Sequence, residues 1–216
     1  MISRLRWFLV FAALTSVVPA QAWGVVEPIN PKADHAERWN WFARAVYALH
    51  ERLVAEHDVR KVERVGGYAH QPNFYREIEY VDRKSGLLIS RLQWESAHPD
   101  RLHSIEVYVY DANGRVERDY GAWYLTHSRT APQATVINLY AYPDGLRALR
   151  QFDASDNRLF EMCEGTYRGQ PVNIELWELD ILRLTGEPDT VMTSPAYAAC
   201  FSELPGQSAG RYLTPQ

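Results

Sequence analysis

Alternation of apolar and polar residues around glycine-containing turns is the feature that most restricts the fold of this 216-residue chain. In VYVYDANGRVERDYGAWYL, residues 107–125, the alternation runs up to Asn113-Gly114 and resumes after it. Side chains that alternate in this way lie on opposite faces of a β-strand. The segment therefore predicts a β-hairpin, with a type I′ turn because an Asn-Gly pair readily adopts positive φ at both central positions.

Three further turn signals separate strand-like runs in the same region. They lie at Ser85-Gly86, at Pro143-Asp144-Gly145 and at ASDN, residues 154–157. Closely spaced runs joined by short turns are typical of an antiparallel meander. We expect a curved sheet of about seven or eight antiparallel strands over residues 61–165.

An amphipathic helix is predicted before the sheet, over residues 34–57. Asp34 and Glu37 have the spacing of a capping box, and apolar residues then recur at steps of three and four. This stripe contains Trp39, Phe42, Ala43, Val46, Leu49, His50 and Leu53. A helix buries such a stripe against another element, so the predicted fold class is α+β, with the helix packed on one face of the sheet.

The C-terminal part, residues 172–204, gives mixed signals. Its leucines between positions 176 and 184 fit a short helix that ends before Gly186, with Pro188 as a stop. The following PAYAACFSEL is expected to return to the sheet or its edge. Residues 205–216 are rich in Gly, Ser and Pro and are expected to form a flexible tail. Residues 23–204 together fit one exported globular domain.

The first 22 residues have the three parts of a secretory signal peptide. Arg4 and Arg6 form the basic region, residues 7–18 the apolar region, and Ala20-Gln21-Ala22 the cleavage pattern. The apolar run is shorter than the roughly 20 residues that span a bilayer, so we expect cleavage after Ala22 and no remaining transmembrane anchor. The predicted location is the periplasm or the extracellular medium.

The two cysteines and the net charge restrict the chemistry further. Cys163 and Cys200 both follow the predicted cleavage site, and a pair of cysteines in an oxidising compartment predicts one disulfide. The formal net charge is −4, and removal of Arg4 and Arg6 would lower it by two. An acidic chain repels phosphates, so nucleic acid is not an expected partner.

One short segment, Tyr108–Val116 (YVYDANGRV), resembles the core of a YD repeat from large bacterial surface and toxin proteins. Those proteins carry many copies in tandem, whereas this chain has weaker versions in YVDRKSGLL and FDASDNRLF. The resemblance covers nine residues and implies a strand-turn-strand unit without a function.

The spacing of the seven histidines does not support a metal site. His50 and His57 are two helical turns apart, whereas ligands that share an ion on a helix need i,i+3 or i,i+4 spacing. His98, His103 and His127 fall in predicted loops or at strand starts. No metal and no cofactor are therefore predicted.

Catalytic motifs are also missing from the sequence. The chain has neither a G-x-S-x-G elbow nor a phosphate-binding loop. Acidic pairs occur at Glu77/Glu79, Asp153/Asp156 and Glu161/Glu164, but a glycosidase needs two carboxylates at a defined separation across a cleft, which sequence spacing does not show. The enzyme hypothesis instead needs histidines and carboxylates that converge in space. An enzyme with such a converged site stays open as an alternative, with its catalytic residues unknown.

Aromatic residues gather on one face of the predicted sheet. Alternation places Ile105, Val107 and Val109 on one face and Tyr108 and Tyr110 on the other. The predicted ligand-binding residues are Tyr108, Tyr110, Tyr140, Tyr142, Trp94, Tyr120 and Trp123. A curved aromatic face could bind a sugar, an apolar molecule or an extended peptide, or its tyrosines could only cover the sheet with their hydroxyls in water.

The sequence is therefore compatible with three functions. The first is a non-catalytic exported binding or accessory protein that uses this aromatic face. The second is the hydrolase-type enzyme, and the third is an interaction subunit of a cell-envelope assembly that binds a protein partner.

Overall fold

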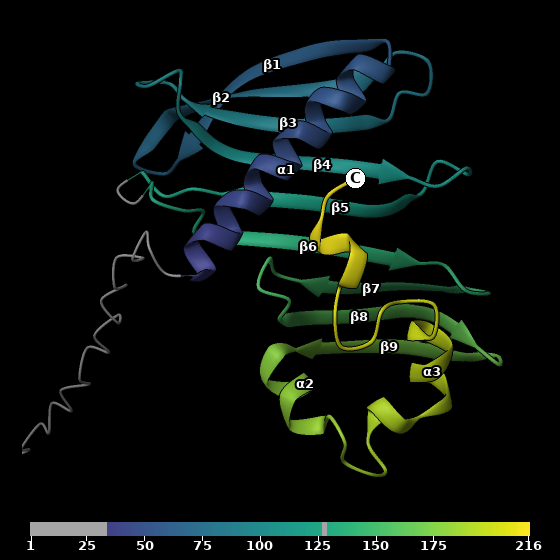
Figure 1. Ribbon diagram of the computed structural model, residues 1–216. Coiled ribbons are helices and arrows are strands. Elements are labelled where there is room, and N and C mark those ends of the chain that lie inside the picture. The colour runs from purple at the N-terminus through teal and green to yellow at the C-terminus, as the bar shows by residue number, and fades with distance from the viewer. Residues whose placement is uncertain (1–33, 127–128) are drawn as a thin grey trace, which may run out of the picture.

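The computed structural model describes residues 34–126 and 129–216. The predicted signal peptide and the linker after it lie outside these residues, as does His127. Within the described ranges the chain forms one antiparallel sheet of nine strands, each beside its neighbours in the sequence (Figure 1). The strands are β1 (Val59–Tyr68), β2 (Gln71–Asp82), β3 (Leu88–Glu95), β4 (Leu102–Tyr110), β5 (Val116–Trp123), β6 (Ala134–Ala141), β7 (Leu146–Phe152), β8 (Arg158–Tyr167) and β9 (Gln170–Trp177).

The meander is confirmed, but its strand count of seven or eight was too low. The sheet extends beyond the predicted range of 61–165 at its C-terminal end, where β9 pairs with β8 along its length. β9 has polar residues between its apolar ones and runs directly into α2 (Glu178–Leu184), so Leu176 at its end fitted the pattern of the following helix as well as that of a strand. At the other end β1 begins at Val59, two residues before the predicted start.

The predicted hairpin at Asn113-Gly114 forms, but its turn is not type I′. Gly114 has φ of 76°, whereas Asn113 is not among the residues with positive φ. Asp111 accounts for this geometry, because its Oδ1 accepts hydrogen bonds from the main-chain N–H groups of Asn113 and Arg115. These bonds hold a three-residue loop in which a single residue, Gly114, adopts the left-handed conformation.

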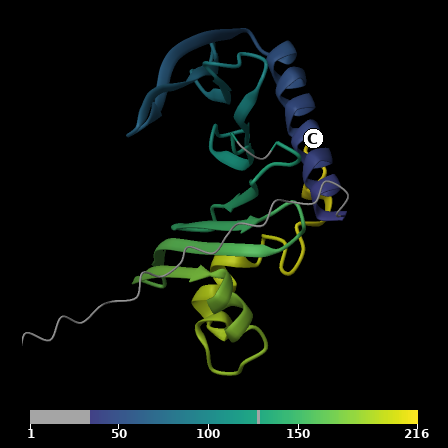
Figure 2. The same ribbon diagram turned by 90° about the vertical axis from the view of Figure 1, so that its left-hand side faces the viewer.

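The predicted N-terminal helix is α1 (Asp34–Glu56), and it crosses one face of the sheet (Figures 1 and 2). Its apolar stripe packs on the aliphatic residues of β2 to β7. The buried members of this cluster include Phe42, Val46 and Leu49 of the helix and Ile105 and Ile137 of the sheet. Each apolar side chain buried in this way contributes about 1.5–3 kcal/mol relative to exposure, so this contact stabilises the fold strongly.

Two short helices form a second layer on the same face at β7 to β9. They are α2 (Glu178–Leu184) and α3 (Pro195–Phe201), with a 3₁₀ turn, η1 (Val191–Thr193), between them. A second apolar cluster joins them to the sheet and contains the Cys163–Cys200 disulfide, which confirms the predicted pairing. Among the described residues, no helix combines the length and the apolar character that crossing a membrane requires.

Two C-terminal segments differ from the sequence-based expectation. PAYAACFSEL contains helix α3 rather than a strand, because Ser194 caps its N-terminus by accepting from Tyr197 N–H and Pro195 occupies the first turn. The segment 205–216, expected to be a flexible tail, instead contains a 3₁₀ turn, η2 (Gly210–Leu213). Ala209, just before it, is buried in the cluster under α1.

Candidate functional site

The seven predicted aromatic site residues are divided between the two faces of the sheet. Tyr120 pairs with Val107 and Ile137, so it lies on the helix-covered face, where it is 1% exposed and contacts Phe42. Trp94 also packs against this core. The alternation from Val116 to Trp123 is interrupted by Gly121 and Ala122, so the sequence alone did not fix the face of Tyr120.

The other five residues lie on the open face, opposite α1. Trp123 lies across Gly121, where a Cβ atom would come within 2.2 Å of the indole ring. Tyr110 and Tyr142 donate hydrogen bonds to the main-chain oxygens of Leu88 and Val116. Tyr108 donates to Glu106, and Tyr140 donates to Asp119. These four hydroxyls therefore bond to protein acceptors. Ligand binding by this face stays a prediction.

The open face also carries a row of polar side chains that bond across neighbouring strands. Arg91 of β3 pairs with Glu79 of β2 at 2.9 Å and with Glu106 of β4 at 3.4 Å. Further along the row, Asp119 accepts from Asn138 and Tyr140. Cross-strand pairs of this kind stabilise a sheet, and they account for the polar positions of the alternating pattern.

Asp119 is the most perturbed acid of this row. Burial raises the pKa of its carboxyl to about 6, although its hydrogen bonds to Asn138 and Tyr140 act in the opposite direction. Because the folded state then holds the proton more tightly than the unfolded state, stability falls as pH rises from about 4 to 6. The difference amounts to at most about 3 kcal/mol.

We expect the variant Asp119→Asn to lose this pH dependence, since an amide does not ionise. Urea unfolding of both proteins between pH 4 and pH 7.5 measures the effect. The unfolding free energy of the natural protein, relative to that of the variant, should fall as the pH rises from about 4 to 6 and then level off. If the unfolding free energies of the two proteins changed in parallel with pH, the result would contradict a raised pKa of Asp119.

His50 and His103 make buried structural contacts. His50 is buried with Nδ1 at 2.7 Å from Ser90 Oγ, and burial, with Lys61 nearby, lowers its pKa to about 4. His103 Nε2 lies 2.5 Å from Tyr68 Oη within a cluster of aromatic rings. Within residues 34–126 and 129–216, no group of three His, Cys, Asp or Glu side chains could hold a metal ion.

One histidine and one carboxylate meet at a cleft, as the enzyme hypothesis requires. His57, just after α1, places Nδ1 2.9 Å from Asp82 Oδ2 at the edge of a cavity of about 820 Å³. Hydrogen bonds from Ser85 and His57 hold the pKa of Asp82 well below its usual range. However, Ser85 Oγ donates to Asp82 and not to the histidine. A nucleophile must bond to the base, so this arrangement fixes the β2–β3 turn against α1 rather than forming a triad.

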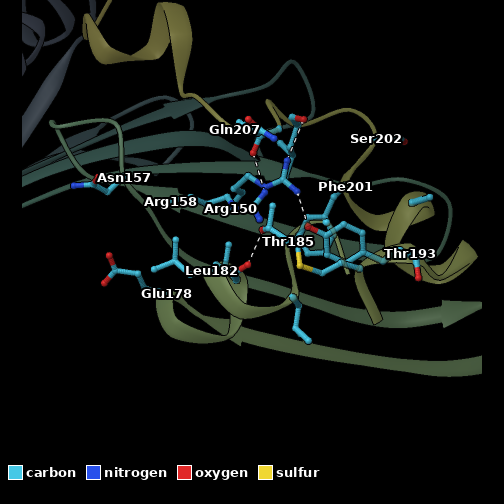
Figure 3. A pocket seen from close by; sticks show the side chains of 18 of the residues that line it. Arg150, Asn157, Arg158, Glu178, Leu182, Thr185, Thr193, Phe201, Ser202 and Gln207 are labelled. Carbon is cyan, nitrogen blue, oxygen red and sulfur yellow. Dashed lines mark hydrogen bonds between the residues drawn. The ribbon is translucent and has the colours of Figure 1, made fainter. Parts of the chain in front are cut away.

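A different cavity, of about 630 Å³, lies between α2, α3 and the sheet and is called here the α2–α3 pocket (Figure 3). Its apolar wall comes from both helices and from the segment between them. The apolar side chains of this wall are Ile181, Leu182, Leu184, Met192, Phe201 and Leu204. Pockets of a few hundred Å³ with mostly apolar walls and a few polar groups are the usual form of small-molecule sites.

A buried ionic cluster lies at the base of the α2–α3 pocket. Arg150 Nε donates to Glu161 Oε1, while Nη1 donates to the main-chain oxygen of Pro205 and Nη2 to Tyr197 Oη. Tyr197 donates to Glu161 Oε2 at 2.7 Å. Burial and this bond to Glu161 raise the pKa of Tyr197 to about 12, so it remains a donor. All hydrogen-bonding groups of the Glu161 carboxylate are thus used inside the protein.

Arg158 is a second cation of the pocket lining. Its Nη1 donates to the main-chain oxygen of Gly206 and lies 3.6 Å from Glu161 Oε1, and its side chain is 12% exposed. Asn157, Gln207 and the carboxylates of Asp156 and Glu178 also line the pocket. An apolar molecule with one polar end fits this combination.

Sequence reasoning missed this site. The residues come from β7, β8, α2, α3 and the segment after α3, and no local spacing joins them. One signal was present: Arg150 and Glu161 occupy positions where the strand pattern expects aliphatic residues facing the helices. A charged residue at such a position needs a buried partner, because an unpaired buried charge is very unfavourable.

Comparison of the chain with protein-family models, with curated proteins and with solved structures finds no match.

Proposed function

We propose that this protein is a non-catalytic binding protein of an oxidising compartment, and that it holds a small amphipathic molecule in the α2–α3 pocket. The observation that carries the proposal is the pocket itself, which combines an apolar wall with the guanidinium of Arg158 in its lining. A fatty acid or another chain with a single acidic end has the matching chemistry. Such a ligand buries its chain along the wall and places its acid group beside Arg158.

The disulfide supports an exported location for this function. Cys163–Cys200 joins β8 to α3 beside the pocket, and disulfides of this kind persist in the periplasm and outside the cell. The signal-peptide pattern of residues 1–22 agrees with this location. A binding role also agrees with the His57–Asp82 pair, which lacks a nucleophile among the described residues.

Filling the pocket should weaken binding of the fluorescent fatty acid cis-parinaric acid. Met192 lines the pocket, so the indole of Met192→Trp would occupy the space of the ligand chain. We expect the affinity of the Met192→Trp variant for cis-parinaric acid to fall by at least about tenfold, which corresponds to a loss of about 1.4 kcal/mol of binding free energy. Fluorescence titration measures the dissociation constants.

Val191 provides the matched control, since it is the neighbouring residue of η1, is exposed and does not line the pocket. Val191→Trp should bind like the natural protein. A second filling variant, Leu184→Trp, guards against a local folding defect. Equal affinities for all four proteins, with the disulfide intact, would overturn the proposal.

A further inference from the structure

Large apolar side chains are exposed on the outer surface of the α2 segment. Leu179 and Leu182 are 78% and 67% exposed. Trp177, the last residue of β9, is 60% exposed but packs on Phe160 on the opposite face of the sheet. Leu179 and Leu182 are three residues apart on the helix and therefore share one side, while Ile181 faces the sheet. Single exposed leucines are common, but several within one short segment indicate an interaction surface.

Carboxylates are frequent in the sequence around these apolar residues. Five acidic residues and a single basic one, Arg183, lie between positions 175 and 191. The acidic residues are Glu175, Glu178, Asp180, Glu187 and Asp189. The segment alone thus carries a formal charge of −4, which equals that of the entire chain. Arg183 is engaged with Asp180 at 3.2 Å and does not offset the remaining acids.

We infer that the surface formed by Leu179, Leu182 and these acidic residues, the acidic α2 surface, binds a cationic amphipathic segment of another protein. Such a segment would place apolar side chains against Leu179 and Leu182 and Lys or Arg side chains against the carboxylates. A second copy of this chain would bring like charges together. An anionic membrane would be repelled for the same reason.

This inference is independent of the ligand in the α2–α3 pocket. Leu179 and Trp177 do not line that pocket. Leu182 and Glu178 do line it, so these two residues are shared between the pocket and the acidic α2 surface. A partner on the acidic α2 surface would therefore contact the side of the pocket. The pocket-filling variant Met192→Trp should leave partner binding unchanged, so the two proposals can fail separately.

The test uses a synthetic amphipathic helix of leucine and lysine, about 18 residues or five turns long, labelled for fluorescence anisotropy. A peptide with glutamate in place of lysine is the charge control. We expect the lysine peptide to bind, its affinity to fall with added salt, and the glutamate peptide not to bind. The full chain after signal removal is used throughout.

Variants locate the binding surface. Leu179→Ser should weaken binding of the lysine peptide by about tenfold, and Glu187→Gln combined with Asp189→Asn should weaken it and reduce its salt dependence. Val65→Ser is the matched apolar control, because Val65 is 62% exposed on the distant strand β1. Glu51→Gln combined with Asp100→Asn is the charge control.

Three results would overturn the inference. In the first, Leu179→Ser and Val65→Ser affect peptide affinity equally. In the second, sedimentation shows a dimer that Leu179→Ser dissociates, which would assign the surface to a second copy. In the third, the protein co-sediments with phosphatidylglycerol vesicles through Leu179, which would assign it to a lipid surface.

Discussion

The variant Glu161→Gln should lose about 3–5 kcal/mol of unfolding free energy, because it removes the negative charge from a buried cluster that holds two guanidinium groups. Glu161 is fully buried and bonds to Arg150, to Tyr197 and, at 3.6 Å, to Arg158. The Glu161 side chain itself has no exposed surface, so solvent does not screen its interactions with the guanidinium groups. Urea unfolding at pH 7 measures the loss.

Glu164 supplies a matched control on the same strand. It pairs with Arg147 of β7 at 3.3 Å, but both side chains are about half exposed. Exposed pairs contribute about 0–1 kcal/mol, so Glu164→Gln should be nearly neutral. A similar small loss for both variants would show that the Arg150–Glu161 cluster does not stabilise the fold.

A double variant separates the effect of charge from that of packing. In Arg150→Met with Glu161→Leu, both members of the ion pair are replaced by apolar side chains. We expect this protein to be more stable than Glu161→Gln, because no guanidinium of Arg150 is left without its carboxylate. A double variant less stable than Glu161→Gln would indicate that the hydrogen bonds to Tyr197 and Pro205 dominate.

The sheet and α1 could be predicted from the sequence because their signals are local. Gly86 and Gly145 adopt positive φ at the predicted turns, and the stripe from Phe42 to Leu49 has the helical period. Alternation also assigned Val107 and Tyr108 to opposite faces. Each of these inferences used only neighbours within one element or one hairpin.

The α2–α3 pocket could not be predicted because its contacts are distant in sequence. Arg150 and Tyr197 are 47 residues apart, and the helix that carries Tyr197 has only seven residues. A helix this short is not stable alone in water, so its propensity pattern is weak and tertiary contacts decide its structure. The cap formed by Ser194 and Pro195 was the local signal that could have identified α3.

Removal of the disulfide should have the second large effect. The double variant Cys163→Ala, Cys200→Ala opens a link between residues separated by 37 positions, and chain entropy predicts a loss of about 3–4 kcal/mol. The link joins α3 to β8, so α3 should also become less ordered, and cis-parinaric acid should bind more weakly in the α2–α3 pocket. Urea unfolding and fluorescence titration measure the two effects.

The effect on the pocket distinguishes two roles of the disulfide. If α3 is held mainly by the apolar contacts of Tyr197 and Phe201, the variant loses stability but keeps its affinity for the fatty acid. If the covalent link fixes α3, both quantities fall together, and the natural protein treated with a reductant behaves like the variant. We expect the second outcome, because a seven-residue helix has too few turns to remain ordered without a fixed attachment.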